Sequence, residues 1–536
     1  MAALTRSSAV LLGILALAAF LRVWGMDYGI PHPTARPDEE RIVGRSMHIL
    51  ATGDFHPGDY TYPGLLKYLN TLLLAAYVWV GTLVGRYDRT FDFLFDAAVL
   101  RPGLGYAISR WTSVVLGVAT VGATYLLGRD AYRNKAVGLV AAAALATNLF
   151  HVRDSRFATV DATMTFFIVM SILFAIRVSR DWRLRDFLLA GAFAGFATAT
   201  KYNAGLVILS LIVPTLLGIV KSRSSGSEIP SPVSLLERLV LAGLVMTGVF
   251  VACTPYTLLN FSRVLHQLGT IQGQLYGSVA PRALWTHLSV SFPVGFGWLF
   301  FVAAAAGLVR MLWLRRSSDI VLLAYFVPSF VTIASVRWIL PRYLMPDIPL
   351  VALAASEFLV VVVGRSRMMP TLLLGVGLAV PGLVRSVGFD RLAAAADTRL
   401  QASEWVAHNL APQTEVLLCR GYGAPFLNED RRRPPAFQPS LVDCTPEAVR
   451  GTGARFLITH EHPVITSYSE VSGEMKAFLA EHASPRIVFD PFRGTPSVLP
   501  YFYPSDAFFL PISHFGTLTR GGPIVTVWER SPAESP

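Results

Sequence analysis

Charged residues are scarce in this sequence of 536 residues. They make up 15% of the chain, whereas ordinary soluble domains carry about 25%, and 53% of the residues are hydrophobic and lie in runs. These proportions argue against a soluble globular protein and indicate a polytopic membrane protein. Cysteine is scarce as well. Cys253, Cys419 and Cys444 show no CxxC spacing, so neither a zinc site nor a framework of disulfides is indicated.

Acidic residues are fewer than basic ones, and the formal net charge is +11. In a soluble protein such a charge suggests nucleic acid, but here Lys and Arg cluster in short connections between apolar runs. That distribution is the usual signature of membrane orientation, in which basic connections stay in the cytoplasm. We therefore predict contact with membrane lipids and no nucleic-acid partner.

Twelve apolar runs are candidates for membrane-spanning helices, which need about 17 to 25 mostly apolar residues. In the stretch 187–220, the residues Lys201, Tyr202 and Asn203 predict a hinge between two helices, of the kind that lines a cavity. The first run has no small-residue cleavage site after it, so we expect an uncleaved anchor. The runs are residues 8–24, 65–84, 107–127, 136–150, 160–176, 187–200, 204–220, 239–253, 288–309, 320–336, 344–363 and 369–384.

The basic connections decide how many of these runs cross the membrane. They fall at every second turn of the chain, and they all lie in the cytoplasm only if one of the first three runs does not cross. Run 65–84 contains Lys67 and Asn70, so we expect a helix that lies at the outer surface or dips in and returns. The prediction is eleven crossings of the plasma membrane, with a cytoplasmic N-terminus and an outer C-terminus.

We predict two domains. Residues 1–385 are expected to form an α-helical transmembrane module with a long first outer loop at 25–106, which contains the surface helix at 65–84. Residues 386–536 are enough for one further domain. This tail alternates helix-like and strand-like pieces, which predicts a small α/β domain outside the cytoplasm.

Short sequence patterns in the tail predict one helix and two strands. Residues 397–410 have apolar positions at helical spacing, while 415–419 and 455–459 have the composition of strands. A disulfide between Cys419 and Cys444 is chemically allowed outside the cytoplasm. Their separation in space cannot be judged from sequence, so the bond is left open.

The first outer loop carries three adjacent carboxylates between two arginines, in the stretch RPDEER at residues 36–41. Asp38 and Glu39 are candidates for chemistry, because ionisable residues near helix ends at one face of a membrane are functional candidates by default. A solvated helix start explains the same pattern, since Pro37 suits the first turn and acids favour the N-terminal dipole. The motif alone leaves both interpretations open.

Further ionisable residues lie at predicted outer turns. Asp161 begins an apolar run, where it needs a partner, and Arg156 five residues earlier is the plain structural candidate. Lys201 can snorkel to the interface, and Arg342 with Tyr343 can anchor the chain there. The topology nevertheless places Asp161, Lys201 and Arg342 on the same side as the acids of the first loop. Such acids can activate an acceptor, and such cations can hold a phosphate.

In these segments the sequence resembles the GT-C glycosyltransferases, in particular the branch of the protein O-mannosyltransferases and the aminoarabinose transferases of lipid A. The resemblance covers roughly residues 8–363 and rests on the order and spacing of short segments. Family members often have two prolines where this chain has Pro63 and Gly64, and residues 86–101 have no assigned counterpart. The segments are RVWG at 22–25 followed by DE at 38–39, YPGLLKY at 62–68, RFATVDATMTFF at 156–167, TKY at 200–202 and RYLMP at 342–346.

The resemblance implies a membrane enzyme of the cell envelope. It would move one sugar from a polyprenyl-phosphate carrier to an acceptor hydroxyl of a lipid, glycan or protein at the outer face. Arg342 and Lys201 are then expected to stabilise the leaving phosphate, because its charge grows as the bond to the sugar breaks. Lys67, Arg156 and Tyr343 are further candidates for donor binding.

Asp38 is the expected general base, which takes the proton of the acceptor hydroxyl as that hydroxyl attacks C1 of the sugar. Asp161 would orient the acceptor or Asp38, and Glu39 is the third acid of the site. One attack from the face opposite the phosphate inverts the anomeric centre. Because basic side chains can match a phosphate monoanion, we expect neither a bound metal nor another cofactor, with a divalent cation as the alternative.

Two other functions fit the same composition. A transporter or lipid flippase also places charges in membrane cavities, but this sequence has no internal similarity and gathers its acids at one predicted surface. A non-catalytic subunit of an envelope assembly would keep the fold without needing Asp38. The sequence does not identify the sugar, the polyprenol or the acceptor.

Overall fold

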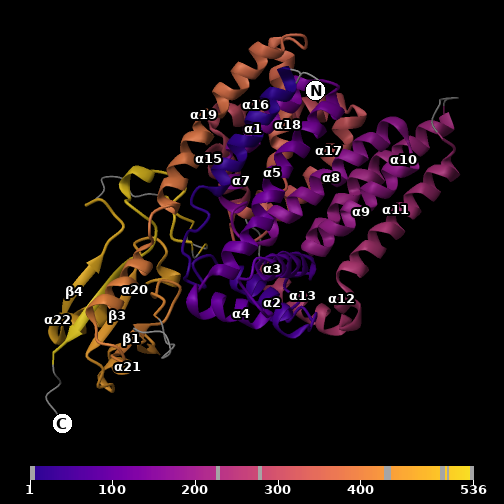
Figure 1. The fold of residues 1–536 in the computed structure, drawn as a ribbon. Helices are drawn as coiled ribbons and strands as arrows, with labels where there is room; N and C mark the ends of the chain where they lie inside the picture. Colours follow the sequence, from indigo (N-terminus) through magenta and orange to yellow (C-terminus); the bar gives the residue numbers. More distant parts are fainter. Residues whose placement is uncertain are drawn as a thin grey trace. The chain divides into compact units, whose positions relative to one another are not determined.

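The computed structural model describes residues 6–224, 230–275, 281–427, 436–494, 501–503, 506 and 508–531. The chain forms two compact units, whose elements can be followed along the chain in Figure 1. The membrane unit consists of residues 1–23, 52–73 and 110–387, and the tail unit consists of residues 24–51, 74–109 and 388–536. The tail unit therefore contains two segments of the predicted first outer loop as well as the end of the chain.

Helices form the membrane unit, and helices at its boundaries have residues in both units. The boundary helices are α2 (Glu39–Thr52), α3 (Leu65–Leu83), α5 (Leu104–Tyr132) and α19 (Met368–Ala393). The others are α1 (Arg6–Val23), α6 (Lys135–Thr147), α7 (Leu149–Asp154), α8 (Val160–Asp181), α9 (Leu184–Thr200), η2 (Tyr202–Ile208), α10 (Leu209–Ser224), α11 (Pro232–Cys253), α12 (Pro255–Leu259), α13 (Phe261–Leu275), α14 (Pro281–Thr286), η3 (His287–Ser291), α15 (Phe292–Phe296), α16 (Trp298–Leu314), α17 (Ser317–Ala334), η4 (Pro341–Leu344) and α18 (Ile348–Val363).

The predicted fold class is confirmed. The twelve apolar runs all overlap helices, and the chain is a multi-pass membrane protein. Among the residues that the structure describes, 8 helices are long and apolar enough to cross a membrane, or up to 9 if a bent pair counts as one span. Leu65–Leu83 is one of the 8 on length and composition. The eleven crossings and the surface position of this helix therefore stay predictions.

The candidate span at 288–309 is bent. Arg282–Phe296 and Trp298–Leu314 together are long and apolar enough for one span, and they meet at an angle of 118°. Gly297 lies between them with a φ of 95°, a conformation that glycine adopts without steric cost and that a helix cannot continue through. The predicted hinge after α9 is confirmed, because Lys201 is extended there, with φ −153° and ψ 126°.

Glycines let membrane helices approach closely. A Cβ atom on Gly191 of α9 would collide with the backbone carbonyl of Ala242 in α11, and one on Gly307 of α16 would collide with that of Ala354 in α18. Burial from water does not drive association inside a bilayer, so close van der Waals packing of this kind holds the helices together. The packing also fixes α9, which carries Lys201 at its end.

The tail unit contains a mixed five-stranded sheet with the strand order β2-β1-β3-β5-β4. Strand β1 is parallel to β2 and β3, whereas β5 is antiparallel to β3 and β4. The predicted helix and both predicted strands of the tail are present. The elements are α20 (Thr398–Asn409), β1 (Glu415–Cys419), β2 (Gln438–Val442), α21 (Pro446–Arg450), β3 (Phe456–Glu461), η5 (Thr466–Tyr468), α22 (Gly473–His482), β4 (Ala483–Phe489), η6 (Phe515–Thr517) and β5 (Ile524–Arg530).

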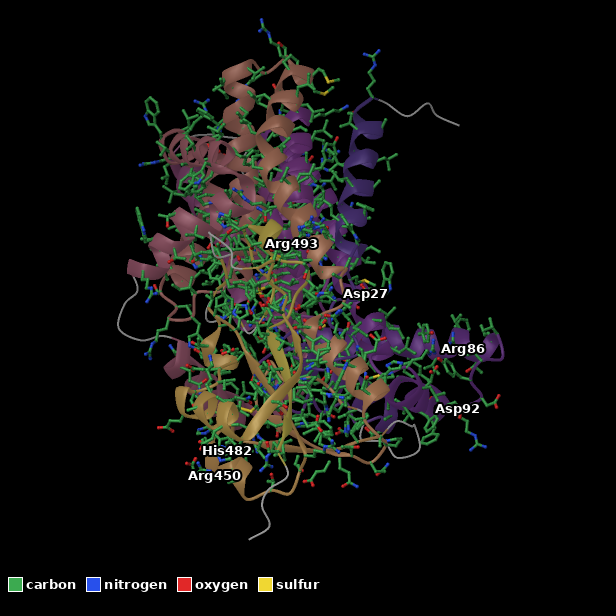
Figure 2. The ribbon with its side chains drawn as sticks, turned by 90° about the vertical axis from the view of Figure 1, so that its left-hand side faces the viewer. Asp27, Arg86, Asp92, Arg450, His482 and Arg493 are labelled. Carbon is green, nitrogen blue, oxygen red and sulfur yellow. A yellow bond between two sulfur atoms is a disulfide. The ribbon has the colours of Figure 1, made fainter. Side chains whose placement is uncertain are left out.

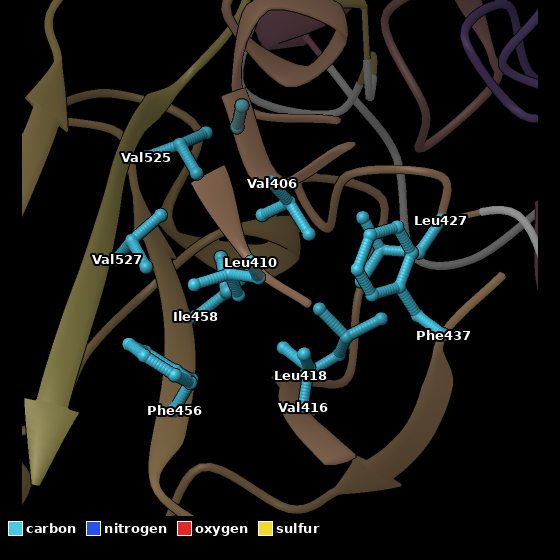
Figure 3. Close-up of a cluster of buried hydrophobic side chains, with 11 residues drawn as sticks. Val406, Leu410, Val416, Leu418, Leu427, Phe437, Phe456, Ile458, Val525 and Val527 are labelled. Atoms are coloured by element: carbon cyan, nitrogen blue, oxygen red, sulfur yellow. The ribbon is translucent and has the colours of Figure 1, made fainter. Parts of the chain in front are cut away.

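Apolar side chains cover both faces of this sheet. Val416 and Leu418 of β1 lie in one buried cluster with Val406 of α20 (Figure 3). Leu417 and Cys419 lie in a second cluster, which includes residues of α22. Successive side chains of a strand point to opposite faces, and a strand that is buried on both faces is a continuous apolar run. That is why the composition of 415–419 predicted a strand without alternation.

Cys419 and Cys444 form a disulfide, the bond that the sequence left open. Their Cα atoms are 4.9 Å apart, within the usual range for bridged cysteines. The bond ties the end of β1 to the chain just after β2. Disulfides persist in oxidising compartments, which agrees with the predicted outer location of the tail.

Residues 86–101, which had no counterpart in the resemblance, form α4 (Thr90–Phe95) and η1 (Asp96–Leu100) in the tail unit. Tyr87 donates a hydrogen bond to Asp96 at 2.7 Å, and Arg101 pairs with the same carboxylate. Arg86 and Asp92, both labelled in Figure 2, line a cavity of about 530 Å³ beside them. This segment is therefore an ordered part of the tail unit.

Candidate functional site

The predicted site residues are divided between the two units. Asp38 and Glu39 belong to the tail unit. The membrane unit contains Lys67, Arg156, Asp161, Lys201, Arg342 and Tyr343. Each unit thus holds one part of the predicted site, the candidate base in one and the candidate phosphate-binding cations in the other.

Asp161 and Lys201 form an ion pair in the membrane unit. The Nζ atom of Lys201 lies 2.8 Å from Oδ1 of Asp161, and the two side chains are 16% and 2% exposed. Asp161 lies in the first turn of α8, where a carboxylate is favoured by the helix dipole. Lys201 lies at the hinge between α9 and η2. The partner of Asp161 is therefore Lys201 from a distant helix, and not the neighbouring arginine that the sequence suggested.

The ring of Tyr343 lies near two cations, Lys201 of this pair and Arg342. The Nζ atom of Lys201 is 4.8 Å from the centroid of the Tyr343 ring, and Cζ of Arg342 is 6.0 Å from the same centroid. Arg342 is buried, at 8% exposure, and both residues lie on η4. A cation within about 6 Å of an aromatic centroid is attracted to its face. Two positive charges at one ring can hold an anion such as phosphate between them.

Lys67 is bound by a loop of its own unit. Its Nζ atom donates to the backbone oxygens of Pro57 at 2.9 Å and Asp59 at 3.1 Å, and it lies 3.4 Å from Oδ2 of Asp59. Its side chain is fully buried. These contacts give Lys67 a structural role at the start of α3, and its role in donor binding stays a prediction.

Arg156 is buried at the end of α1. Its Nη2 atom donates to the backbone oxygen of Leu21 at 2.8 Å, and Arg22 donates to that of Ala146 at 3.2 Å. Carbonyl groups at a helix C-terminus lack intrahelical partners and carry partial negative charge. Arg156 therefore caps the helix that directly precedes the acidic loop in the sequence.

Asp38 has an unusual backbone conformation. Its φ is 76°, in the left-handed region that Asp tolerates better than most residues, and such strain collects at functional sites. It directly precedes α2, in which Glu39 is buried at 1% exposure. Arg36, two residues earlier, pairs with Asp506 at 3.1 Å. The acidic segment is thus held in one conformation, which a positioned base requires.

Buried polar contacts tie the loop after α1 to the start of α20 and to the loop after β1. Tyr28 donates to Oδ2 of Asp397 at 2.8 Å, and Arg399 pairs with the same carboxylate at 2.8 Å. Burial lowers the pKa of His32 to about 4, so the ring is neutral near pH 7. Its Nε2 atom lies 2.7 Å from the backbone oxygen of Ala424. These contacts hold the acidic segment in place within the tail unit.

Among the residues that the structure describes, no three His, Cys, Asp or Glu side chains gather as a metal site. The cations around Tyr343 are the groups available to match a phosphate charge. Catalysis without a metal or another cofactor stays a prediction.

Known proteins share the fold of this chain. The sequence model of the family described as Dolichyl-phosphate-mannose-protein mannosyltransferase matches residues 105–255. The structure is similar to that of ArnT from Cupriavidus metallidurans in the apo state, with a TM-score of 0.54, 13% identity and 98% of both chains covered. The chain has the GT-C fold. The resemblance to the branch of the protein O-mannosyltransferases and aminoarabinose transferases is confirmed.

Two further structures resemble that of this chain. ArnT from Cupriavidus metallidurans bound to undecaprenyl phosphate matches with a TM-score of 0.50, 15% identity and 97% of both chains covered. The archaeal oligosaccharyltransferase AglB from Archaeoglobus fulgidus, in complex with an inhibitory peptide and a dolichol-phosphate, matches with a TM-score of 0.50 and 13% identity. That match covers 85% of this chain and 69% of AglB. A search of curated protein sequences finds no match.

Glu40 is a candidate acid that the sequence patterns did not single out. Its Oε2 atom is buried and has no hydrogen-bond partner in the described part of the chain. Burial raises the pKa of this carboxyl, and the charge of Asp38 raises it further. A raised carboxyl pKa brings a general base closer to the working pH. Glu40 is the third acid of the RPDEER segment, and nothing in the sequence distinguished it from the two acids before it.

Asp347 is a second missed acid, and it lies in the membrane unit of the GT-C fold. It is fully buried, and neither carboxylate oxygen has a hydrogen-bond partner among the described residues. An acid in this position is costly and therefore a functional candidate. The signal was an acid at the start of an apolar run, the same signal that singled out Asp161.

Proposed function

We propose that this protein transfers a sugar from a polyprenyl-phosphate carrier to an acceptor hydroxyl at the outer face of the plasma membrane. The family match and the GT-C fold support glycosyl transfer at a membrane in general. The observation that carries the finer proposal is the gathering of Lys201, Arg342 and Tyr343 beside Asp161. It occurs in a fold that matches a structure of ArnT bound to undecaprenyl phosphate over 97% of both chains.

Lys201 and Arg342 stabilise the leaving phosphate in this mechanism. As the bond from C1 of the sugar to the phosphate oxygen breaks, its electron pair stays on that oxygen and negative charge grows there. Cations aimed at the oxygen stabilise the transition state more than the ground state, so they raise the rate and not only the affinity. Asp161 keeps the Lys201 ammonium in place before the donor arrives.

Asp38 acts as the general base. The acceptor oxygen forms a bond to C1 from the face opposite the phosphate, its proton goes to Asp38, and the anomeric centre inverts. Asp161 orients the acceptor or Asp38, and Glu39 is the third acid. The mechanism uses basic side chains in place of a metal.

Purified protein in lipid vesicles tests this function. A panel of undecaprenyl-phosphate-linked hexoses and pentoses is expected to include a donor that is cleaved, with and without EDTA, to release undecaprenyl phosphate. Asp38→Asn is expected to lower transfer about 10²- to 10⁴-fold, the usual contribution of a positioned base. Asp27→Asn, an exposed position in the same loop, serves as the matched control.

Two outcomes would contradict the proposal. Unchanged transfer by correctly folded Asp38→Asn would reject the assignment of the base. Movement of intact lipid-linked sugar across the vesicle bilayer without cleavage would support a transporter or flippase instead.

A further inference from the structure

The tail unit contains a polar cavity that the mechanism above does not use. Its volume is about 360 Å³, which falls within the range of roughly 300–1,000 Å³ found for small-molecule sites. It lies where the end of β3, η5, the start of α22 and the start of β5 come together. Side chains around it include Glu461, Thr466, Ser469, Glu470, Val471 and Lys476.

The lining suits a ligand with many hydroxyl groups. Glu461 and Glu470 accept hydrogen bonds, Thr466 can donate and accept, and Lys476 donates while pairing with Glu461 at 2.5 Å. Val471 offers an apolar surface for the C–H groups of a sugar ring. The two carboxylates against one ammonium leave the cavity with a net negative charge, which disfavours phosphorylated or acidic ligands.

An aromatic pair lies next to the cavity lining in the same unit. Ser469 of the cavity follows Tyr468, and the rings of Tyr468 and Tyr422 meet edge to face with centroids 5.6 Å apart. Ala424, two residues after Tyr422, contacts the segment that carries Asp38, because its backbone oxygen lies 2.7 Å from Nε2 of His32. Burial raises the pKa of the Tyr422 hydroxyl, and the negative charges of Glu40 and Asp38 raise it further. A Cβ atom on Gly423 would lie 2.6 Å from the hydroxyl oxygen of Ser469, so the loop that contacts His32 also lies against the cavity lining.

The loop that carries Tyr422 is held rigidly. The backbone oxygen of Tyr422 accepts a hydrogen bond from Arg399 at 2.8 Å, and that of Ala424 contacts His32 at 2.7 Å. A Cβ atom on Gly423 would collide with the ring of His460. Rigid placement of aromatic side chains lowers the cost of ordering them around a ligand.

We propose that this cavity, with Tyr468 and Tyr422, binds a carbohydrate acceptor and presents its terminal hydroxyl to Asp38. This inference rests on the proposed function and names the acceptor as a glycan. A basic peptide would satisfy the two carboxylates, but Lys476 would repel it and the aromatic pair would add little specificity. A saccharide uses the donors, the acceptors and the rings together.

Glycan binding by the full chain tests the inference directly. Full-length protein in nanodiscs is applied to a printed oligosaccharide array that covers neutral, amino-bearing and acidic sugars, and the strongest ligand is then titrated in solution. Glu470→Gln and Thr466→Val each remove one polar contact from an exposed position, so the fold should survive. Each is expected to weaken binding about tenfold, the effect of losing one hydrogen bond of roughly 1.4 kcal/mol. Glu474→Gln, exposed on α22 and outside the cavity lining, is the matched control.

Each outcome of this experiment either supports or overturns the inference. Binding of neutral or amino-bearing saccharides that weakens in both variants and not in the control supports the inference. No saccharide binding, binding that the variants leave unchanged, or displacement of the saccharide by a lysine-rich peptide overturns it. Hydrolysis of the lipid-linked donor by the wild-type protein without acceptor tests the proposed function separately. A protein that hydrolyses donor but binds no glycan would lose this inference alone.

Discussion

The Nζ atom of Lys201 lies 2.8 Å from the Oδ1 atom of Asp161, although 40 residues separate them in the sequence. The pair joins the hinge after α9 to the first turn of α8. Because Asp161 is almost completely buried, the cost of its charge is offset by Lys201. The ring of Tyr343 lies beside the same ammonium group. A donor phosphate that enters here would share a cation that is already in position.

Replacing Lys201 separates the catalytic role proposed for it from its structural one. Lys201→Met is expected to lower kcat/KM for the donor about 10²- to 10³-fold, as for other groups that stabilise developing charge. It also leaves Asp161 buried without a counter-ion, at a cost of about 3–5 kcal/mol in folding stability. The double variant Lys201→Met with Asp161→Asn should regain thermal stability and stay inactive. Recovery of transfer in the double variant would show that Lys201 serves the structure alone.

Glu40→Gln is expected to stabilise the protein relative to the wild type, and this difference should grow as the pH rises. Burial raises the pKa of Glu40 above its value in the unfolded chain, so the folded state favours the protonated form. The stability that this group contributes is present below the unfolded pKa and is lost as the pH rises through the raised value. Thermal midpoints from pH 4 to pH 8 should therefore diverge in favour of the variant. Glu481→Gln, at an exposed position of the tail, is the control, and a difference that does not change with pH would contradict this prediction.

Tyr28→Phe removes the hydrogen bond from the loop after α1 to Asp397. Loss of a buried hydrogen bond to a charged group is expected to cost about 1–3 kcal/mol of folding stability. Because this loop carries the acidic segment, transfer should fall through kcat more than through KM for the donor. Steady-state kinetics and thermal unfolding measure the two effects. Tyr501→Phe, at an exposed position, is the control. An equal loss of kcat and of folding stability in this control would show that the hydrogen bond of Tyr28 is not the cause.

The Cys419–Cys444 bond offers a test of the tail's compartment and stability. In protein purified without reductant, both thiols should resist alkylation until a reductant is added, as read by mass spectrometry. The bond closes a loop with a sequence separation of 25. The chain-entropy relation predicts a loss of roughly 3–4 kcal/mol when both are replaced by serine. Free thiols in the untreated protein would place the tail in a reducing compartment.

Cysteine labelling tests whether both parts of the proposed site face the same side of the membrane. In a Cys253→Ala background, Arg41→Cys and Arg337→Cys are expected to react with a membrane-impermeant maleimide in intact cells. Arg180→Cys, in a basic connection predicted to be cytoplasmic, should react only after permeabilisation. Labelling of the first two positions from opposite sides would exclude a shared pocket for Asp38 and Arg342.

Local patterns predicted much of the fold. The apolar runs all overlap helices, the hinge at Lys201 lies where the polar TKY segment interrupts two runs, and β1 spans 415–419 as its composition indicated. These features succeed because hydropathy and periodicity act over a few turns or one strand. The break at Gly297 was missed, because a glycine within an apolar run has the same hydropathy signal in a straight helix and in a bent one.

Side-chain partnerships could not be predicted in the same way. Arg156 was the plain structural partner for Asp161 because the two are close along the chain, whereas helix packing pairs Asp161 with Lys201. The burial of Glu40 and of Asp347 likewise depends on which elements cover them. Neither acid differs in the sequence from an exposed carboxylate.

The amino-acid sequence was sufficient for the membrane class, the helical segments and the α/β tail. Each depends on composition or spacing within one segment, where the local environment of a residue is set by its neighbours. The tertiary structure decided the ion pair of Lys201, the disulfide between Cys419 and Cys444, and the inclusion of the acidic loop in the tail unit. Those contacts depend on packing between distant segments, which no local pattern encodes.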